Sequence, residues 1–434
     1  MARTKNLDHF YSLLDQYRNI AFPDSLQQES SPIATLELLG TINYVKSVSD
    51  QQIIDIIVSG CKSIGHETTL SRYFYQFMYK QFSKQIRVTN FRSSQFDMTI
   101  HYLLEGLDNT NDLSDDHKVD LLRALSSLVF ETANHTQRSA NRLSTLLLRF
   151  ANPSYTSLQV RRMAINCIGN ACANAGNTKL QAFFQEFYAC LLSNLCKVDR
   201  TSEGTLLVRA PTTDILNDDA SIRKIASSTL RALQFLLSQD KSLVTNPLCD
   251  MIDIIHTFIF MQVNVHTYSI QSTKMPTRRN KLLTTPLTKP SFSWRTTTAS
   301  LSYQMKSMSL VTSSESELSD SPTLTPELSP RRQRDYTKIR INALLCLSAI
   351  ATTSPKVLYS HWSKFLPDTF SIFLSNNTNS EGKLLPFLRT DNQPYSLFTI
   401  LLYDPIIHVR SAVCHALIAM LNGSKNYLSL ALER

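Results

Sequence analysis

The chain has 434 residues, a formal net charge of +9 and a pI of about 9.1. Apolar residues make up 43% and charged residues 18%, with only nine glycines, which is typical of packed helices and disfavours a glycine-rich nucleotide-binding α/β fold. A chain of this length forms either two or three globular domains or one elongated array of repeats.

No segment has the pattern of a secretory signal or of a membrane span. The N-terminus lacks a long apolar stretch, and the most apolar run, residues 251–265, is interrupted by polar side chains and is too short to cross a bilayer. The eight cysteines show no CxxC spacing and lie mainly within apolar helical patterns. We therefore expect a reducing cytoplasmic and/or nuclear setting, without structural zinc.

Amphipathic helices are predicted along most of the chain from the spacing of apolar residues. The predicted segments are, in order, 7–20, 36–44, 51–63, 70–82, 96–107, 119–131, 142–150, the helix containing Val160, 183–195, 218–237 and 247–265. Residues 197–216 interrupt this series as an insertion. The alternation of helix, turn and helix indicates a repeat unit of two helices.

Four of the later helices share one template. Each has Val or Ile followed directly by Arg, and then apolar residues on a single helical face; the pairs are Val160-Arg161, Ile222-Arg223, Ile339-Arg340 and Val409-Arg410. In the last of them, Asp404 is predicted as the N-cap and Pro405 as the first helical residue. Four helices with one pattern predict stacked repeats.

A long segment separates the third template from the second. Between residues 272 and 334 the apolar periodicity disappears, and 18 of the 40 residues from Ser291 to Pro330 are Ser or Thr. Such a segment is predicted to be disordered, since it buries too little apolar surface to offset its ordering entropy. The predicted organisation is a helical block at 1–271, a disordered insertion at 272–334 and a second helical block at 335–434.

The insertion contains four hydroxyl residues that each precede a proline. They are candidate phosphorylation sites, and each phosphate would add about 1.5 to 2 negative charges. These residues are Thr285, Ser321, Thr325 and Ser329.

The stretch from Asp404 to Leu421 resembles the second helix of a HEAT repeat. In that family an Asp and an Arg form a polar ladder between neighbouring repeats, so the resemblance implies a structural ladder role for Asp404 and Arg410. The Arg residues of the other three templates, Arg161, Arg223 and Arg340, are assigned the same role by this resemblance.

Two segments, 338–350 and 356–368, together with the Ser/Thr/Pro-rich insertion before them, look like the N-terminal region of the HEAT repeat-containing protein six family. That resemblance implies an all-α, HEAT/armadillo-like solenoid without an assigned reaction. It also implies that the array continues beyond Arg434.

Three asparagines, Asn166, Asn170 and Asn174, recur every four residues on one helix face. The pattern resembles the inner helix of armadillo repeats, where asparagines grip the backbone of an extended peptide. Arg162 stands where that family usually has a tryptophan. The alternative is structural: Asn166 and Asn170 bond between repeats, and Asn174 caps the helix.

The sequence contains no HExxH, GxxxxGK[ST], GxGxxG or GxSxG motif. We therefore expect a non-enzymatic protein-binding scaffold or adaptor, with no cofactor, metal or small-molecule substrate. Two alternatives remain open: a karyopherin-like transport receptor that grips peptides through the asparagines, and a basic solenoid associated with nucleic acid.

Overall fold

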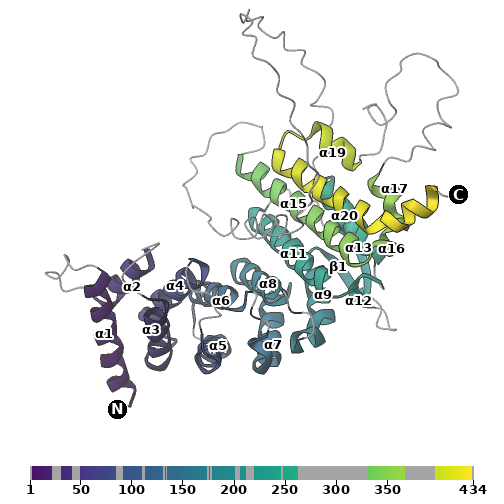
Figure 1. The fold of residues 1–434 in the computed structure, drawn as a ribbon. Helices are drawn as coiled ribbons and strands as arrows, with labels where there is room; N and C mark the ends of the chain where they lie inside the picture. Colours follow the sequence, from purple (N-terminus) through teal and green to yellow (C-terminus); the bar gives the residue numbers. More distant parts are fainter. Residues whose placement is uncertain are drawn as a thin grey trace, which may run out of the picture. The chain divides into compact units, whose positions relative to one another are not determined.

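A computed structural model describes residues 2–21, 31–41, 49–84, 91–109, 113–130, 132, 134–173, 175, 178–200, 206–211, 219–245, 248–261, 330–366 and 396–432. The fold is an all-α solenoid of stacked helices with one small β-hairpin (Figure 1). Residues 1–265 and 330–434 form a single compact unit.

The helices divide into two rows. The outer row contains α1 (Ala2–Ala21), α3 (Asp50–Ser63), α5 (Ser93–Asp108), α7 (Ala140–Ala151), α9 (Phe184–Ser193), α13 (Leu248–Ile259) and α19 (Leu397–Tyr403). The inner row contains α2 (Pro32–Thr41), α4 (Thr69–Lys84), α6 (Asp115–Val129), α8 (Leu158–Cys172), α11 (Ala220–Gln239), α15 (Pro330–Thr353) and α20 (Ile407–Leu432). Short elements are α12 (Ser242–Thr245), α16 (Pro355–Leu358), α17 (Trp362–Phe365) and the 3-10 turns η4 (Thr136–Arg138), η5 (Lys179–Phe183) and η8 (Tyr359–His361).

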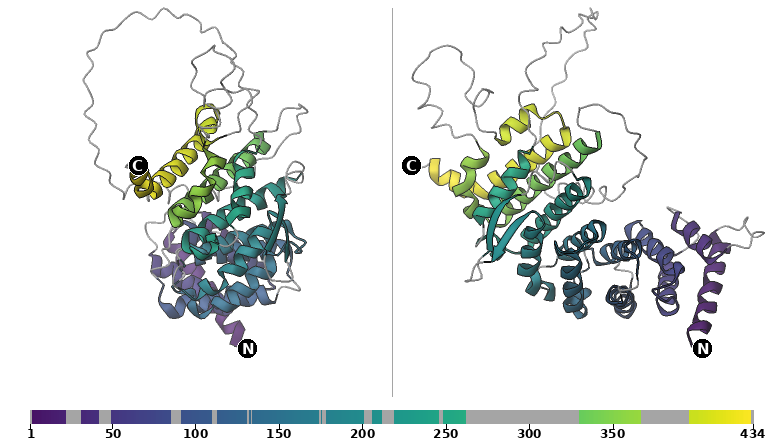
Figure 2. Two further views of the ribbon diagram at one scale, coloured as in Figure 1. Left: turned by 90° about the vertical axis from the view of Figure 1, so that its right-hand side faces the viewer. Right: turned by 180° about the vertical axis from the view of Figure 1, so that it is seen from behind.

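Each inner helix packs against the next one, from α2 through α4, α6, α8, α11 and α15 to α20. The views from the front and from behind both show α11, α15 and α20 side by side (Figures 1 and 2). Outer helices pack in the same order from α1 to α9. One hydrophobic cluster runs through both rows, because each helix buries an apolar stripe against its neighbours.

Local sequence sets several helix starts. The Ser49 hydroxyl accepts from the backbone N–H of Gln52 at 3.4 Å, and the Gln52 side chain accepts from the Ser49 N–H at 2.8 Å, which forms a capping box. Asp219 caps α11 by accepting from the Ser221 N–H at 2.6 Å. These contacts satisfy backbone donors that have no partner within the first helical turn.

Two helix boundaries differ from the predictions. Asp404 is not the N-cap of α20, since it follows the last turn of α19 and its carboxylate accepts from the Ile406 N–H at 2.9 Å. The helix begins two residues after Pro405 instead. The third template helix starts earlier than predicted, at Pro330, so residues 330–334 are helical and the predicted boundary at 334/335 is wrong. Residues 272–329, where disorder was predicted, lie outside the described residues.

Within the part of the chain that the structure describes, one β-hairpin departs from the helical pattern. Strands β1 (Cys196–Arg200) and β2 (Leu206–Pro211) pair antiparallel within the insertion predicted at 197–216. The strands lie beside α9 and α13 respectively. The hairpin therefore occupies the connection between two repeats without entering the inner row.

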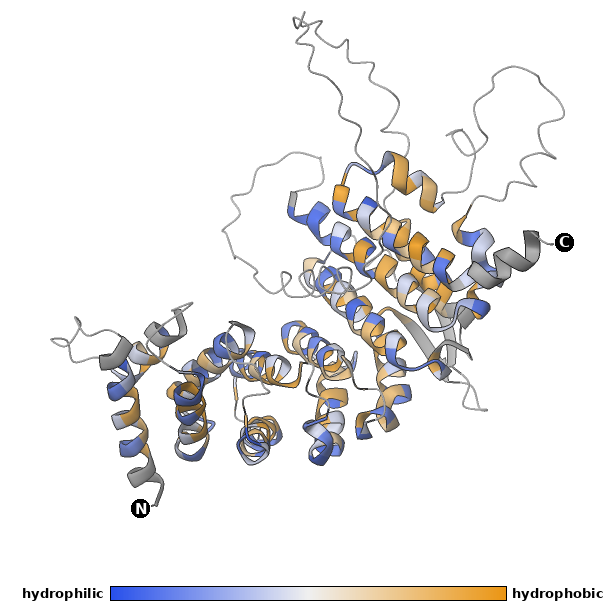
Figure 3. Cartoon of the chain, in the orientation of Figure 1, coloured by the Kyte–Doolittle hydropathy of each residue, from blue (hydrophilic) through white to orange (hydrophobic). Residues whose placement is uncertain are grey.

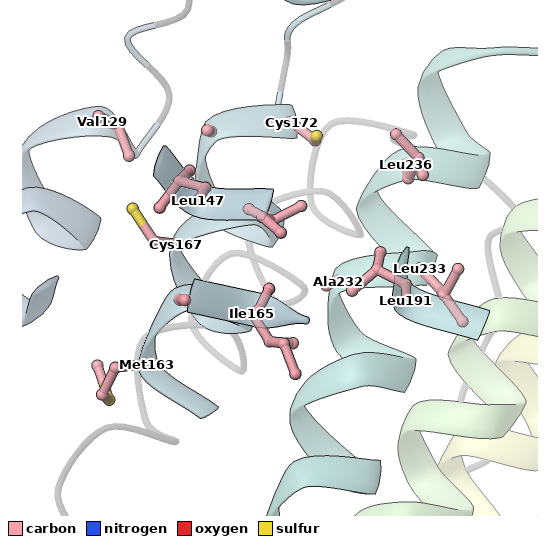
Figure 4. Packing of buried hydrophobic residues seen from close by; sticks show 14 of the residues in the cluster. Val129, Leu147, Met163, Ile165, Cys167, Cys172, Leu191, Ala232, Leu233 and Leu236 are labelled. Atoms are coloured by element: carbon pink, nitrogen blue, oxygen red, sulfur yellow. The ribbon is translucent and has the colours of Figure 1, made fainter. Parts of the chain in front are cut away.

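The junction of α8 and α11 is unusually close. A Cβ atom added to Gly169 would lie 2.9 Å from the Cα and 3.1 Å from the Cβ of Ala232. Figure 4 shows this junction, with Ile165 of α8 on the side of Ala232 and Leu233 of α11. Only a glycine at position 169 lets the two helix backbones approach this closely.

None of the described helices is by itself long and apolar enough to span a bilayer. One pair of helices with a sharp bend between them, Arg331–Thr353 with Pro355–Phe365, has the length and apolar composition of a span when the two are taken together.

Candidate functional site: the solvent-facing strip of the inner helices

Three sides of α8, α11 and α15 are engaged in packing, against the two neighbouring inner helices and one outer helix. On α15, Asn342, Cys346 and Thr353 hydrogen-bond to α11, while Arg340 pairs with the residue preceding α20. Because a helix turns by about 100° per residue, residues such as Lys338 and Leu345 fall on the remaining side. Lys338 is exposed and Leu345 is half-buried.

Aligning the template arginines identifies the corresponding side of the two preceding inner helices, α8 and α11. On these two helices that side contains half-exposed residues three or four positions apart. We call this surface the inner strip and define it by Arg162 and Asn166 of α8, Lys224 and Ser228 of α11, and Lys338 and Leu345 of α15.

The first row of the inner strip is cationic. Arg162 and Lys224 directly follow the template arginines of α8 and α11, whereas Lys338 lies two residues before the template arginine of α15, about one helical turn from the equivalent position. Packed helices lie about 8 to 10 Å apart, so these cations form an oblique line across the stack. An anionic ligand laid across α8, α11 and α15 would meet all three charges.

Two of the template arginines form buried ion pairs that join neighbouring repeats. Arg223 of α11 pairs with Asp335 of α15 at 3.3 Å, with both side chains at most 10% exposed. Arg340 of α15 pairs with Asp404, whose side chain is 2% exposed, and also donates to the Ile259 carbonyl at 3.2 Å. Each arginine therefore bonds forward to the aspartate that precedes or opens the next inner helix.

Arg161 and Arg410 differ from this pattern. Arg161 donates to the Pro153 carbonyl of its own repeat, and burial lowers the pKa of its guanidinium. The Nε atom of Arg410 is buried and has no hydrogen-bond partner among the described residues. Among the described residues, ion pairs of the arginine ladder thus join α11 to α15 and α15 to Asp404 before α20.

Asn166 and Asn170 make different contacts. The Asn170 amide donates to the Ser126 carbonyl at 3.1 Å and to its hydroxyl at 2.8 Å, which ties α8 to α6. Asn342 ties α15 to Ser227 of α11 in the same way, at 2.8 and 3.0 Å. Asn166 has only a 3.9 Å contact from its amide to the Met163 sulfur and lies on the inner strip.

Asn174 lies outside the described residues, as do the candidate phosphorylation sites Thr285, Ser321, Thr325 and Ser329. The described part of the structure contains no group of three or more His, Cys, Asp or Glu side chains that could hold a metal ion.

Sequence reasoning missed two features near the inner strip. One is the row formed by Arg162, Lys224 and Lys338: the first two follow their template arginines directly, and Lys338 lies on the same helix side about one turn earlier. The other is Asp120 of α6, whose buried carboxylate accepts from Arg72 at 3.0 Å and from Arg123 at 3.2 Å. Its partners come from different helices, so helical spacing alone gives no signal for it.

Replacing Asn170 by alanine is expected to lower the free energy of unfolding by about 1 kcal/mol, because two hydrogen bonds between repeats are lost. Asn166→Ala is the matched control and should change it by less than about 0.5 kcal/mol. Guanidinium unfolding followed by circular dichroism measures both. An equal loss in the two variants would show that Asn170 has no special role between repeats.

Comparisons with known proteins find a family model that matches the end of the chain and a relative that matches most of it. Residues 338–434 match a family model described as a domain of unknown function, DUF4042. A protein of Dictyostelium discoideum, named only as uncharacterised, is 26% identical over 351 residues, which are 72% of this chain and 20% of the relative. The chain therefore spans about a fifth of that relative's length.

Two solved structures are among those that the chain is similar to. An engineered protein superposes with a TM-score of 0.39 and 10% identity, covering 85% of this chain and 97% of that one. A mutant of Kap121p superposes with a TM-score of 0.32 and 12% identity, covering 96% of this chain and 39% of that one.

Proposed function

We propose that this protein is a non-enzymatic scaffold of the HEAT type that binds an acidic segment of a partner protein along the inner strip. The observation that carries the proposal is the cationic row of Arg162, Lys224 and Lys338 on three stacked helices. Surface cations at separate points of a rigid scaffold attract an extended anionic chain and fix its register.

The scaffold is rigid where the row lies. The pairs Asn342–Ser227 and Arg223–Asp335 hold α15 against α11, and the tight approach of Gly169 to Ala232 holds α11 against α8. A ligand that spans the three helices therefore meets a preformed surface and pays little reorganisation cost on binding.

We also propose that the protein belongs to the HEAT repeat-containing protein six family and is located in the cytoplasm and/or nucleus. Phosphorylation of Thr285, Ser321, Thr325 or Ser329 stays a prediction, and each phosphate would bring negative charge to a protein whose inner strip is basic.

A charge-reversal experiment tests the proposal. The triple variant Arg162→Glu, Lys224→Glu, Lys338→Glu is compared with Lys179→Glu, Lys241→Glu, Lys356→Glu, which makes the same change in charge at exposed lysines outside the inner strip. Both variants and the wild type are used for proximity labelling in the native cell, followed by mass spectrometry.

The expected result is that the inner-strip variant loses a set of protein partners which the control variant keeps. Identical partner sets for the two variants would refute the proposal. Partners that disappear after nuclease treatment would instead favour the nucleic-acid alternative, because a cationic row also attracts phosphates.

The karyopherin-like alternative rests on the position of Asn166 within the inner strip. It requires Asn166→Ala to abolish capture of an extended peptide. Asn170 supports it less, since both of its amide contacts are made to Ser126.

A further inference from the structure

An apolar surface is left uncovered at the last inner helix. Four large hydrophobic side chains are exposed among the described residues, and all four lie in α19 or α20: Leu402 (47%), Ile407 (65%), Ile418 (47%) and Leu421 (53%). Figure 3 shows hydrophobic colour along α19 and the first part of α20. Such a concentration on one helix pair marks an interaction surface.

The surface is equivalent to a packing face seen earlier in the stack. When Arg410 is aligned with Arg340, Cys414 and Leu421 correspond to Leu344 and Ala351 of α15. Leu344 and Ala351 are 0% exposed on the helix that packs against α20, whereas Cys414 is exposed. We call the surface formed by Ile407, Arg410, Cys414 and Leu421 the end face.

The end face also contains a cation whose equivalents on α11 and α15 are paired with carboxylates, whereas Arg161 on α8 bonds to a carbonyl. Arg223 bonds to Asp335, and Arg340 bonds to Asp404, each on the next inner helix or directly before it. The buried Nε of Arg410 has no such partner among the described residues. Leaving a buried donor of a charged group without a partner costs free energy, so the end face favours an occupant that brings a carboxylate.

From these observations we infer that the end face binds one more helix pair of the same repeat type, stacked on α20 as α20 stacks on α15. The occupant places an aspartate, just before or within the first turn of its inner helix, against Arg410, and covers Ile407, Cys414 and Leu421 with an apolar helix face. The inference concerns a different surface from the inner strip and does not depend on the proposed function.

Cys414 provides a direct readout because its thiol lies in the middle of the end face. Five of the other cysteines form little thiolate at neutral pH, because burial raises the pKa of Cys190 to about 11 and raises those of Cys61, Cys167, Cys172 and Cys346 further. Alkylation at Cys414 is followed by peptide mass spectrometry at neutral pH.

The probe is a second copy of residues 396–432 joined to the C-terminus of the full chain by a Gly/Ser linker long enough to span α20. Its own equivalent of Cys414 is replaced by serine, so that only the Cys414 thiol of the end face is measured. Alkylation of Cys414 is expected to slow about tenfold or more relative to the unextended chain.

Two control variants isolate the ion pair. The change D404N within the appended copy alone, or Arg410→Gln in the chain, should restore most of the alkylation rate. An equally fast reaction in the extended and unextended proteins would overturn the inference. So would a Cys414 that is already protected in the unextended chain and becomes reactive on dilution, since a second copy would then be the occupant.

Discussion

Replacing Arg340 by methionine is expected to lower the free energy of unfolding by about 3 to 5 kcal/mol. The substitution leaves the carboxylate of Asp404 buried, with its side chain 2% exposed, and removes its cationic partner. It also removes the bond from Arg340 to the Ile259 carbonyl. Guanidinium unfolding gives the total loss, and hydrogen exchange should place the loss at α15 and α20.

The best control for Arg340→Met is Arg410→Met. Arg410 occupies the same template position but has no carboxylate partner among the described residues, so its loss should cost less than about 1 kcal/mol. Adding Asp404→Asn to Arg340→Met should recover part of the stability, because the unpaired buried charge disappears. Equal losses for the two arginine variants would contradict a structural role for the ladder at α15–α20.

Replacing Gly169 by valine is expected to cost about 3 kcal/mol, the upper part of the range for overpacking a well-packed interface. The new Cβ would lie 2.9 Å from the Cα of Ala232, which is backbone and has no rotamer that relieves the clash. The helices α8 and α11 must then separate, which loosens the apolar contacts along their whole junction. Thermal unfolding measures the effect.

Two substitutions define the size of this effect. Gly169→Ala should cost less than valine, because the gain in helix propensity of about 1 kcal/mol offsets part of the clash. Gly65→Val is the matched control, since a Cβ at Gly65 meets nothing within 4 Å, and it should stay within about 0.5 kcal/mol of the wild type. A loss at Gly65 comparable to that at Gly169 would remove the steric explanation.

The repeated inner helices could be predicted from the sequence for a physical reason. A helix that packs on both neighbours and on its outer partner needs apolar residues at fixed spacings, and the template after Arg223 and Arg340 shows them. Both arginines form ion pairs between inner helices in the structure. The helical period and the charge pattern depend on residues close together in the chain, so both can be recognised in a single sequence.

The features that escaped prediction depend on which elements meet in space. Bonding between repeats was one of the two interpretations of Asn170, but the spacing of the asparagines does not identify its partner Ser126, 44 residues earlier, or distinguish Asn170 from Asn166. Arg161 matches the template but bonds to the Pro153 carbonyl. The hairpin strands are short and contain charged residues, so their pairing has no clear alternating pattern.

The contact between Arg223 and Asp335 joins residues that are 112 positions apart in the chain. Most junctions in a repeat array form between close sequence neighbours, but α15 meets α11 only after a long loop has closed. The entropy of loop closure grows by about 0.6 kcal/mol for each doubling of loop length. High contact order at this one junction should make it the slow step of folding, after α1–α11 and α15–α20 have each assembled.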